Sequence, residues 1–274
     1  MIRRPARHGL IWALLGVVLV GGCARESDGT SAPVNRDPNV IVAYVACGIA
    51  PAIQIAKERF EATNAGKSVR IEVGQPPELV ARIEQGAVPD VFICPGDSEI
   101  GMLERAGLLD PAAGATIGYY RVAIATSAAR PVGLSRPEDL AGSRVESIAM
   151  ATPGINSVGT DGKHALERVG VWDQVQSKLV LYTTPLEAVT AVAEGEASAG
   201  LIYDPCPVLQ LPDMVPPDSV AVVATLNPGE QRPVRIRLGV HRRSPNQLLV
   251  RRFIDVINSE ELRPELAEVG LPGP

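Results

Sequence analysis

Three cysteines stand where apolar segments of the chain end, and their thiols could act together. Cys47 and Cys94 directly follow such segments, and Cys206 comes three residues after Tyr203, which ends another. Thiolates are soft ligands, so three of them could bind Cu(I), Zn(II) with a fourth ligand, or a thiophilic oxyacid such as arsenite. Cys47 also precedes a predicted helix, where a thiolate is stabilised. A disulfide with one odd thiol, and plain packing of small apolar side chains, are the alternatives.

These cysteines would be positioned by short strands that alternate with amphipathic helices. Residues 40–46 form a continuous apolar run, as in a strand covered on both faces, and residues 51–63 place apolar side chains at helical spacing. The same order continues through 69–73, 78–85 and 90–93. Strand, helix, strand, helix, strand is the pattern of a parallel sheet, so the sequence predicts an α/β fold.

The loops after these strands are the candidate binding loops. In open parallel sheets, ligands bind at the carboxyl ends of the strands, where helix N-termini offer unpaired N–H groups and partial positive charge. The loops at that edge are 47–50, 74–78, 156–160, 183–186 and 203–207. Five such loops predict a site built largely from backbone donors, which suits a small anion.

The N-terminal segment has the composition of an export signal. Residues 1–8 carry three arginines, residues 10–20 are apolar, and two glycines then precede Cys23. The apolar run is shorter than the about 20 residues of a membrane span. The segment resembles a bacterial lipoprotein signal, in which the cysteine is acylated and becomes the new N-terminus. An ordinary secretory signal with a chance cysteine is the alternative, and it leads to the same extracytoplasmic location.

Composition narrows the class of the mature protein. The chain is 46% hydrophobic and 21% charged, which favours an ordinary globular core after the polar stretch that follows Cys23. That stretch cannot bury enough apolar surface to order itself, so we expect a flexible tether. The net charge of −5 gives no support for nucleic-acid binding, which requires a basic face, so we expect no nucleic-acid partner.

Four sequence motifs arrive in the order of a known family. They are ACGI at 46–49, IEQGAVPDVFI at 83–93, GLL at 107–109 and GEASAGLIY at 195–203. Together they resemble the periplasmic molybdate-binding proteins of ABC importers. The resemblance implies a type II periplasmic-binding-protein fold, with two lobes, two mainly parallel sheets flanked by helices, and a ligand cleft between the lobes. It further implies hinge closure on one small oxyanion and delivery to an ABC permease.

The resemblance also implies how the chain is divided, and we expect a monomer. Residues 1–22 would be the lipoprotein signal peptide and residues 23–37 the tether. Lobe one would comprise residues 38–118 and 227–274, and lobe two residues 119–226.

Carried over from the family, the ligand contacts fall on the five predicted loops, but several hydroxyl donors are missing. Tyr203 keeps the family's phenol, whereas Gly48 stands where the family usually has a serine, and Gln75 with two prolines replaces a serine-rich loop. Each hydrogen bond lost to a charged ligand costs about 1.5–3 kcal/mol, so the missing donors favour the alternative of a changed ligand. The predicted ligand-binding residues are Cys47, Gly48, Gln75, Ser157, Val158 and Tyr203; the metal alternative is Cys47, Cys94 and Cys206; lipidation falls on Cys23.

Catalysis and sensing are the competing classes. Cys47 could be a nucleophile, but no base lies near it in sequence, and the candidate His164 would belong to the opposite lobe. We therefore predict no enzyme and no cofactor. A lipid-anchored sensor that binds the same ligand without importing it remains an alternative. Asp97, Glu99 and Glu104 are interpreted as a solvated face without a role.

Overall fold

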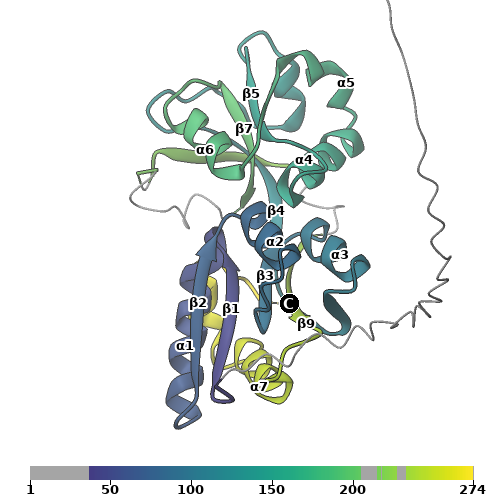
Figure 1. Ribbon diagram of the computed structural model, residues 1–274. Coiled ribbons are helices and arrows are strands. Elements are labelled where there is room, and N and C mark those ends of the chain that lie inside the picture. Colours follow the sequence, from purple (N-terminus) through teal and green to yellow (C-terminus); the bar gives the residue numbers. More distant parts are fainter. Residues whose placement is uncertain (1–36, 205–214, 217, 227–232, 274) are drawn as a thin grey trace, which may run out of the picture. The chain divides into compact units, whose positions relative to one another are not determined.

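The computed structural model describes residues 37–204, 215–216, 218–226 and 233–273 (Figure 1). The predictions for the signal peptide, the tether up to residue 36, Cys23 and Cys206 lie outside these residues. The described residues belong to one compact unit of the chain.

The first part of the chain forms the predicted alternation of strands and helices. Its elements are β1 (Val40–Ala46), the short 3₁₀ helix η1 (Cys47–Ile49), α1 (Ala50–Thr63), β2 (Ser68–Gly74), α2 (Pro76–Glu84), β3 (Val91–Pro95) and α3 (Ser98–Arg105). β1 pairs in parallel with β2 on one side and with β3 on the other. All five residues of β3 are buried, as expected for a strand covered on both faces.

The second part repeats this architecture. Its elements are η2 (Pro137–Ala141), β5 (Ile148–Ala151), α4 (Ser157–Arg168), α5 (Trp172–Val175), η3 (Gln176–Lys178), β6 (Leu179–Tyr182), α6 (Pro185–Ala193), β7 (Ala199–Asp204) and β8 (Val220–Thr225). β5 pairs in parallel with both β6 and β7. The helix α6 packs against β5 and β7. Its residues Ala188, Val189, Ala191 and Val192 belong to a cluster of buried apolar side chains.

One long strand, β4 (Leu109–Ser127), joins the two parts (Figure 1). Its first section pairs antiparallel with β9 (Val234–His241), and its second section pairs antiparallel with β7 and β8. The strand order is therefore continuous, β2-β1-β3-β9-β4-β7-β5-β6, with β8 beside β4. Parallel pairing is confined to strands β1, β2, β3, β5, β6 and β7, so the sheet is more mixed than the mainly parallel arrangement that the sequence predicts.

Within β4, local sequence pattern favours a strand only over residues 121–126. The preceding stretch contains Pro111 and Gly114 and lacks alternation, and the ladder to β9 shifts register between Asp110 and Ala115. A Cβ at Gly114 would stand 2.8 Å from the Leu238 carbonyl oxygen, so close backbone approach requires glycine there. Local pattern could not reveal a strand that depends on pairing with a segment more than 100 residues away.

The C-terminal segment returns to the first part of the sheet. After β9 come α7 (Gln247–Ile257) and α8 (Arg263–Glu268), and α7 packs on α1. The rings of Phe60 and Phe253 meet edge to face, with centroids 5.4 Å apart and an interplanar angle of 80°. Both side chains are fully buried, so this contact packs the helix α7 of the C-terminal segment against α1.

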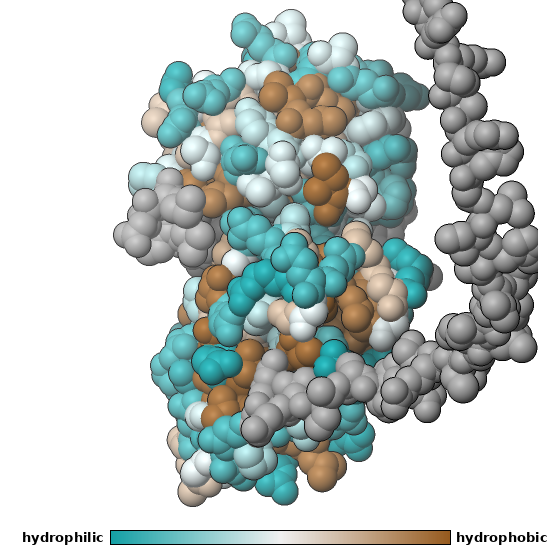
Figure 2. Space-filling view, viewed as in Figure 1, coloured by the Kyte–Doolittle hydropathy of each residue, from teal (hydrophilic) through white to brown (hydrophobic). Residues whose placement is uncertain are grey.

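The surface is mainly hydrophilic on the face that Figure 2 shows, with apolar side chains in separate small groups. Within the described residues, no helix combines the length and the apolar character needed to cross a membrane. The prediction of an α/β fold with helices on both sides of the sheet is confirmed.

A buried carboxylate fastens three segments of the first part together. Asp90 is fully buried; its Oδ2 accepts from the Val42 N–H at 2.7 Å, and its Oδ1 accepts from the Ser244 hydroxyl at 2.6 Å. We expect Asp90→Ala to lower the free energy of unfolding by about 2–4 kcal/mol, because two buried donors lose their acceptor. Urea denaturation followed by circular dichroism measures this loss. The matched control Asp110→Ala removes a half-buried carboxylate that accepts one hydrogen bond, from the Ala112 N–H, and should cost about 1 kcal/mol or less; equal losses would contradict the assignment.

Candidate functional site

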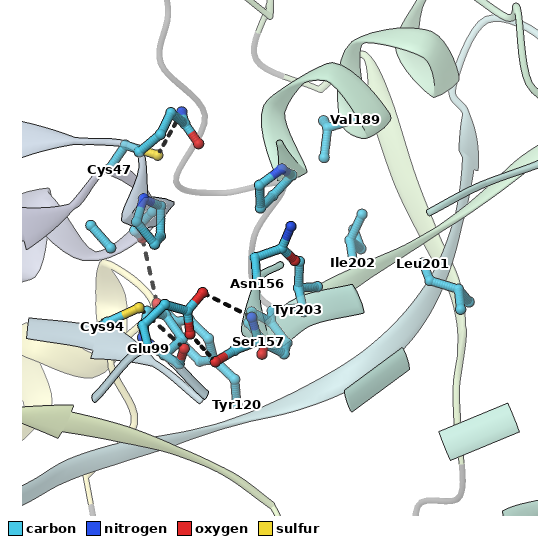
Figure 3. A pocket seen from close by; sticks show the side chains of 17 residues that line it. Cys47, Cys94, Glu99, Tyr120, Asn156, Ser157, Val189, Leu201, Ile202 and Tyr203 are labelled. Carbon is cyan, nitrogen blue, oxygen red and sulfur yellow. Dashed lines mark hydrogen bonds between the residues drawn. The ribbon is translucent and has the colours of Figure 1, made fainter. Parts of the chain in front are cut away.

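A cavity lies among the loops at the carboxyl ends of the strands (Figure 3). It encloses about 80 Å³, several times the roughly 10–15 Å³ that one water requires, so it admits a small ligand. Its lining comes from η1, from α3, from the N-terminal parts of α2, α4 and α6, and from β1, β3, β4 and β7. The residues predicted as ligand contacts all line it: Cys47, Gly48, Gln75, Ser157, Val158 and Tyr203.

The N-terminus of α4 lies at the cavity, and most of its first backbone N–H groups already have acceptors. Asn156 is its N-cap, and the Asn156 side-chain oxygen accepts from the Gly159 N–H at 3.0 Å. The Ser157 N–H donates to Glu99 Oε1 at 2.8 Å. Among the described residues, the Val158 N–H has no acceptor. The first turn of α4 therefore presents one free N–H toward the cavity that Val158 lines.

Glu99 bridges α3 and α4. Besides the Ser157 N–H, its carboxylate accepts from the Ser157 hydroxyl (Figure 3). That hydroxyl in turn accepts from the Ser98 N–H at 3.1 Å. Glu99 is only 2% exposed. Burial raises the pKa of Glu99, and the two hydrogen bonds from Ser157 act in the opposite direction without cancelling that rise.

The interpretation of Glu99 as part of a solvated face is wrong. Its neighbour Asp97 is exposed and Glu104 pairs with Arg237, but Glu99 points into the protein. Glu99 stands four residues before the buried Leu103, and residues at that spacing share one helix face. That spacing was the available sequence signal for its burial.

A glycine allows α4 to approach the turn after β3. Gly96 has φ +87°, and a Cβ built on it would stand 2.1 Å from the Ser157 Cβ and 3.0 Å from the Tyr203 hydroxyl oxygen. No side chain fits there. The contact between Glu99 and Ser157 therefore depends on the missing side chain of Gly96 as well as on its own hydrogen bonds.

Tyr203 closes another wall of the cavity. Its hydroxyl donates to Asp161 Oδ2 at 2.7 Å, and its ring lies 5.9 Å from the ring of Tyr120. Burial, followed by the charge of Asp161, raises the pKa of Tyr203 well above its ordinary value. The phenol is therefore protonated at physiological pH and remains a donor. Neither Tyr120 nor Asp161 was foreseen, because neither stands in a motif.

Cys47 and Cys94 line the cavity as free thiols. Burial raises the pKa of Cys47 and raises that of Cys94 well above its ordinary value, so both side chains are neutral. The expected stabilisation of a Cys47 thiolate by the helix start is thus outweighed by desolvation. Gln75 Nε2 donates to the Cys47 sulfur at 3.3 Å, and the buried Gln75 Oε1 has no hydrogen-bond partner among the described residues. Across the described residues, no three His, Cys, Asp or Glu side chains are grouped to hold a metal, and Cys206 lies outside them.

The fold and this cavity define the class of periplasmic solute-binding proteins. Residues 41–271 match the family described as bacterial extracellular solute-binding protein, and the chain belongs to that family. Proteins of this kind bind a small solute and deliver it to an ABC permease. The family resemblance predicted from the four motifs is confirmed, and the relatives are solute-binding proteins rather than enzymes.

Three comparisons illustrate the relationship. The chain is 21% identical to the putative ABC transporter substrate-binding lipoprotein YvgL of Bacillus subtilis, over 92% of each chain. It is 26% identical to the molybdate-binding protein ModA of Mycobacterium tuberculosis, over 71% of this chain and 74% of that one. The substrate-binding domain of a putative molybdenum ABC transporter from Clostridium difficile superposes with a TM-score of 0.65 at 22% identity, covering 86% of this chain and 99% of that chain. The fold is therefore that of type II periplasmic binding proteins.

The requirement for glycine at position 96 gives a direct test of the α3–α4 contact. Gly96→Ala should weaken ligand binding by at least about tenfold, because the new Cβ would displace Ser157. The same clash should lower the free energy of unfolding. Gly107→Ala is the matched control: φ is +72° there, but no atom lies within 4 Å of the new Cβ. That control should cost about 1–2 kcal/mol of stability and leave binding unchanged. Calorimetric titration with molybdate measures both variants, and equal affinities would contradict the contact's importance.

Proposed function

We propose that this chain is a lipid-anchored, monomeric solute-binding protein of an ABC importer that captures a molybdate-type oxyanion in the cavity. The observation that carries the proposal is the convergence of the predicted ligand residues on one small cavity that includes the N-terminus of α4. Relatives named as molybdate-binding proteins make a tetrahedral oxyanion the first ligand class to test.

Neutral donors would hold the anion. The free Val158 N–H lies at the positive end of the α4 dipole, where an anion is stabilised. The Tyr203 phenol and the Ser157 hydroxyl could turn their hydrogens toward an anion, although both now donate to carboxylates. At Gly48, no atom lies within 4 Å of the position of a Cβ, which leaves room for ligand oxygens.

The same loops also limit the affinity. Pro76 and Pro77 begin α2, and Pro185 begins α6, so these residues have no N–H to offer. We therefore expect binding weaker than a full set of donors would give. Discrimination between molybdate, tungstate and sulfate would depend on how well the few donors match the size of the anion.

We further propose that β4 carries the hinge between two lobes, residues 38–118 with 227–274 and residues 119–226. β4 changes partners from β9 to β7 between Tyr120 and Arg121, two residues after the proposed boundary, and this supports a hinge in that part of the strand. The contact between Phe60 and Phe253 supports placing the C-terminal segment in the first lobe.

The thiol alternative has less support. Two of its three sulfurs line the cavity, but both are held as neutral thiols, and a soft metal would have to displace their protons. The relatives favour an oxyanion. A sensor would use the same cavity. The identity of the ligand is therefore tested first, and delivery to a permease second.

Ligand binding can be tested by isothermal titration calorimetry with molybdate, tungstate and sulfate. Tyr203→Phe should weaken oxyanion binding about tenfold or more, because a hydrogen bond to a charged ligand is worth about 1.5–3 kcal/mol. Tyr182→Phe, which removes a phenol outside the cavity, is the matched control and should bind normally. Cys47→Ser and Cys94→Ser should also keep binding. Loss of oxyanion binding in the serine variants, or binding of Cu(I) in place of any oxyanion, would favour the thiol alternative.

The lipid anchor is tested separately by metabolic labelling with palmitate in a bacterial host. The native chain should incorporate label at the cysteine that becomes its N-terminus, whereas Cys23→Ser should incorporate none. Cys94→Ser, a substitution of a buried cysteine, should be labelled like the native chain. Label persisting in Cys23→Ser would show that the anchor lies elsewhere.

A further inference from the structure

A buried carboxylate occupies the donors that an oxyanion would use. Glu99 lines the cavity and accepts from both the backbone N–H and the hydroxyl of Ser157, at the first residue of α4 (Figure 3). Its carboxyl oxygens therefore already occupy the donors at the helix N-terminus. A ligand that approaches Val158, the next residue, meets this carboxylate.

No cation neutralises Glu99 in the part of the chain that the structure describes. It forms no ion pair there, and the titratable groups that face it are Asp161 on α4, Cys94 on β3 and Tyr203 on β7. Asp161 raises the pKa of Glu99 further, while Cys94 and Tyr203 are neutral.

Among the described residues, neither α2 nor β4 brings an unpaired cationic side chain to Glu99. The α2 helix packs beside α3, but its Arg82 pairs with Glu72. From β4, the cavity receives only the phenol of Tyr120. The basic groups His164 and Arg168 act on Asp161 instead.

A fully deprotonated oxyanion and an ionised Glu99 would repel each other strongly in this poorly solvated cavity. Protonation removes that repulsion and changes the chemistry of the carboxyl group. The neutral acid gains an O–H that can donate to an anion oxygen, and it releases the Ser157 donors from a charged acceptor. Burial already favours the neutral form, since it raises the pKa of Glu99.

We propose that capture of an oxyanion is coupled to uptake of one proton by Glu99, whose carboxyl group then donates a hydrogen bond to the anion. This inference rests on the proposed oxyanion function. The proton comes from solvent, and no other bond forms or breaks. Glu99 thus selects against dianion binding in alkaline surroundings and makes affinity depend on the pH outside the cytoplasm.

The sign of the pH dependence follows from linkage. The complex holds one more proton than the free protein, so the association constant rises as pH falls. Above the pKa of Glu99 in the free protein, it should change about tenfold per pH unit, and below that pKa it should level off. Sulfate and molybdate should show the same slope over about pH 5.5–8.5, where both remain dianions and the coupling therefore belongs to the protein.

The test is calorimetric titration of the full mature protein with molybdate in two buffers of different ionisation enthalpy. The native protein should take up about one proton per anion bound near pH 7. Glu99→Gln, whose amide is a permanent neutral donor, should bind molybdate with little pH dependence and take up almost no proton. Glu104→Gln is the control: it changes a carboxylate of the same helix that pairs with Arg237 outside the cavity, and it should retain the native proton uptake.

The outcomes separate this inference from the function on which it rests. Molybdate binding by the native protein without proton uptake overturns the coupling alone, and so does native proton uptake in Glu99→Gln. Absence of oxyanion binding by the native protein at every pH overturns the proposed function and the coupling with it. The measurement on the native protein requires no variant to fold.

Discussion

The close approach of the α4 N-terminus to the turn after β3 is the contact on which the cavity depends. It is possible because Gly96 has no side chain and a positive φ, so that Ser157 can lie against the backbone. The hydrogen bonds from Ser157 to Glu99 then fix α4 relative to α3. Without this approach, Val158 and Tyr203 would not share a cavity with Gly48 and Cys47.

Among the described residues, the wall of the cavity contains a carboxylate, Glu99, and no cationic side chain. Anion capture must then depend on neutral donors, the dipole of α4 and the protonation state of the acids. Burial opposes ionisation of Glu99 and Asp161 and also keeps the two cysteines and Tyr203 neutral. Desolvation thus acts in the same direction on every titratable group of the site that shifts.

The long strand β4 gives the site its architecture. Since it pairs with β9 in one section and with β7 in the next, both parts of the sheet direct their carboxyl-end loops toward one place. A single continuous strand also limits how far these parts can separate. In the proposed division into lobes, α3 belongs to one lobe and α4 to the other, and the hydrogen bonds between Glu99 and Ser157 join them.

Sequence alone determined the alternating elements, the family and most of the cavity's lining. The loops at the strand ends can be located from local sequence pattern and from glycines. The buried Glu99, the partner Asp161 and the first section of β4 were decided by tertiary structure. Each depends on residues distant in the chain: Glu99 meets Ser157 58 residues later, and Tyr203 meets Asp161 42 residues earlier. The sequence also placed a thiolate at Cys47 by a local argument, whereas burial, which is a property of the assembled fold, keeps that sulfur protonated.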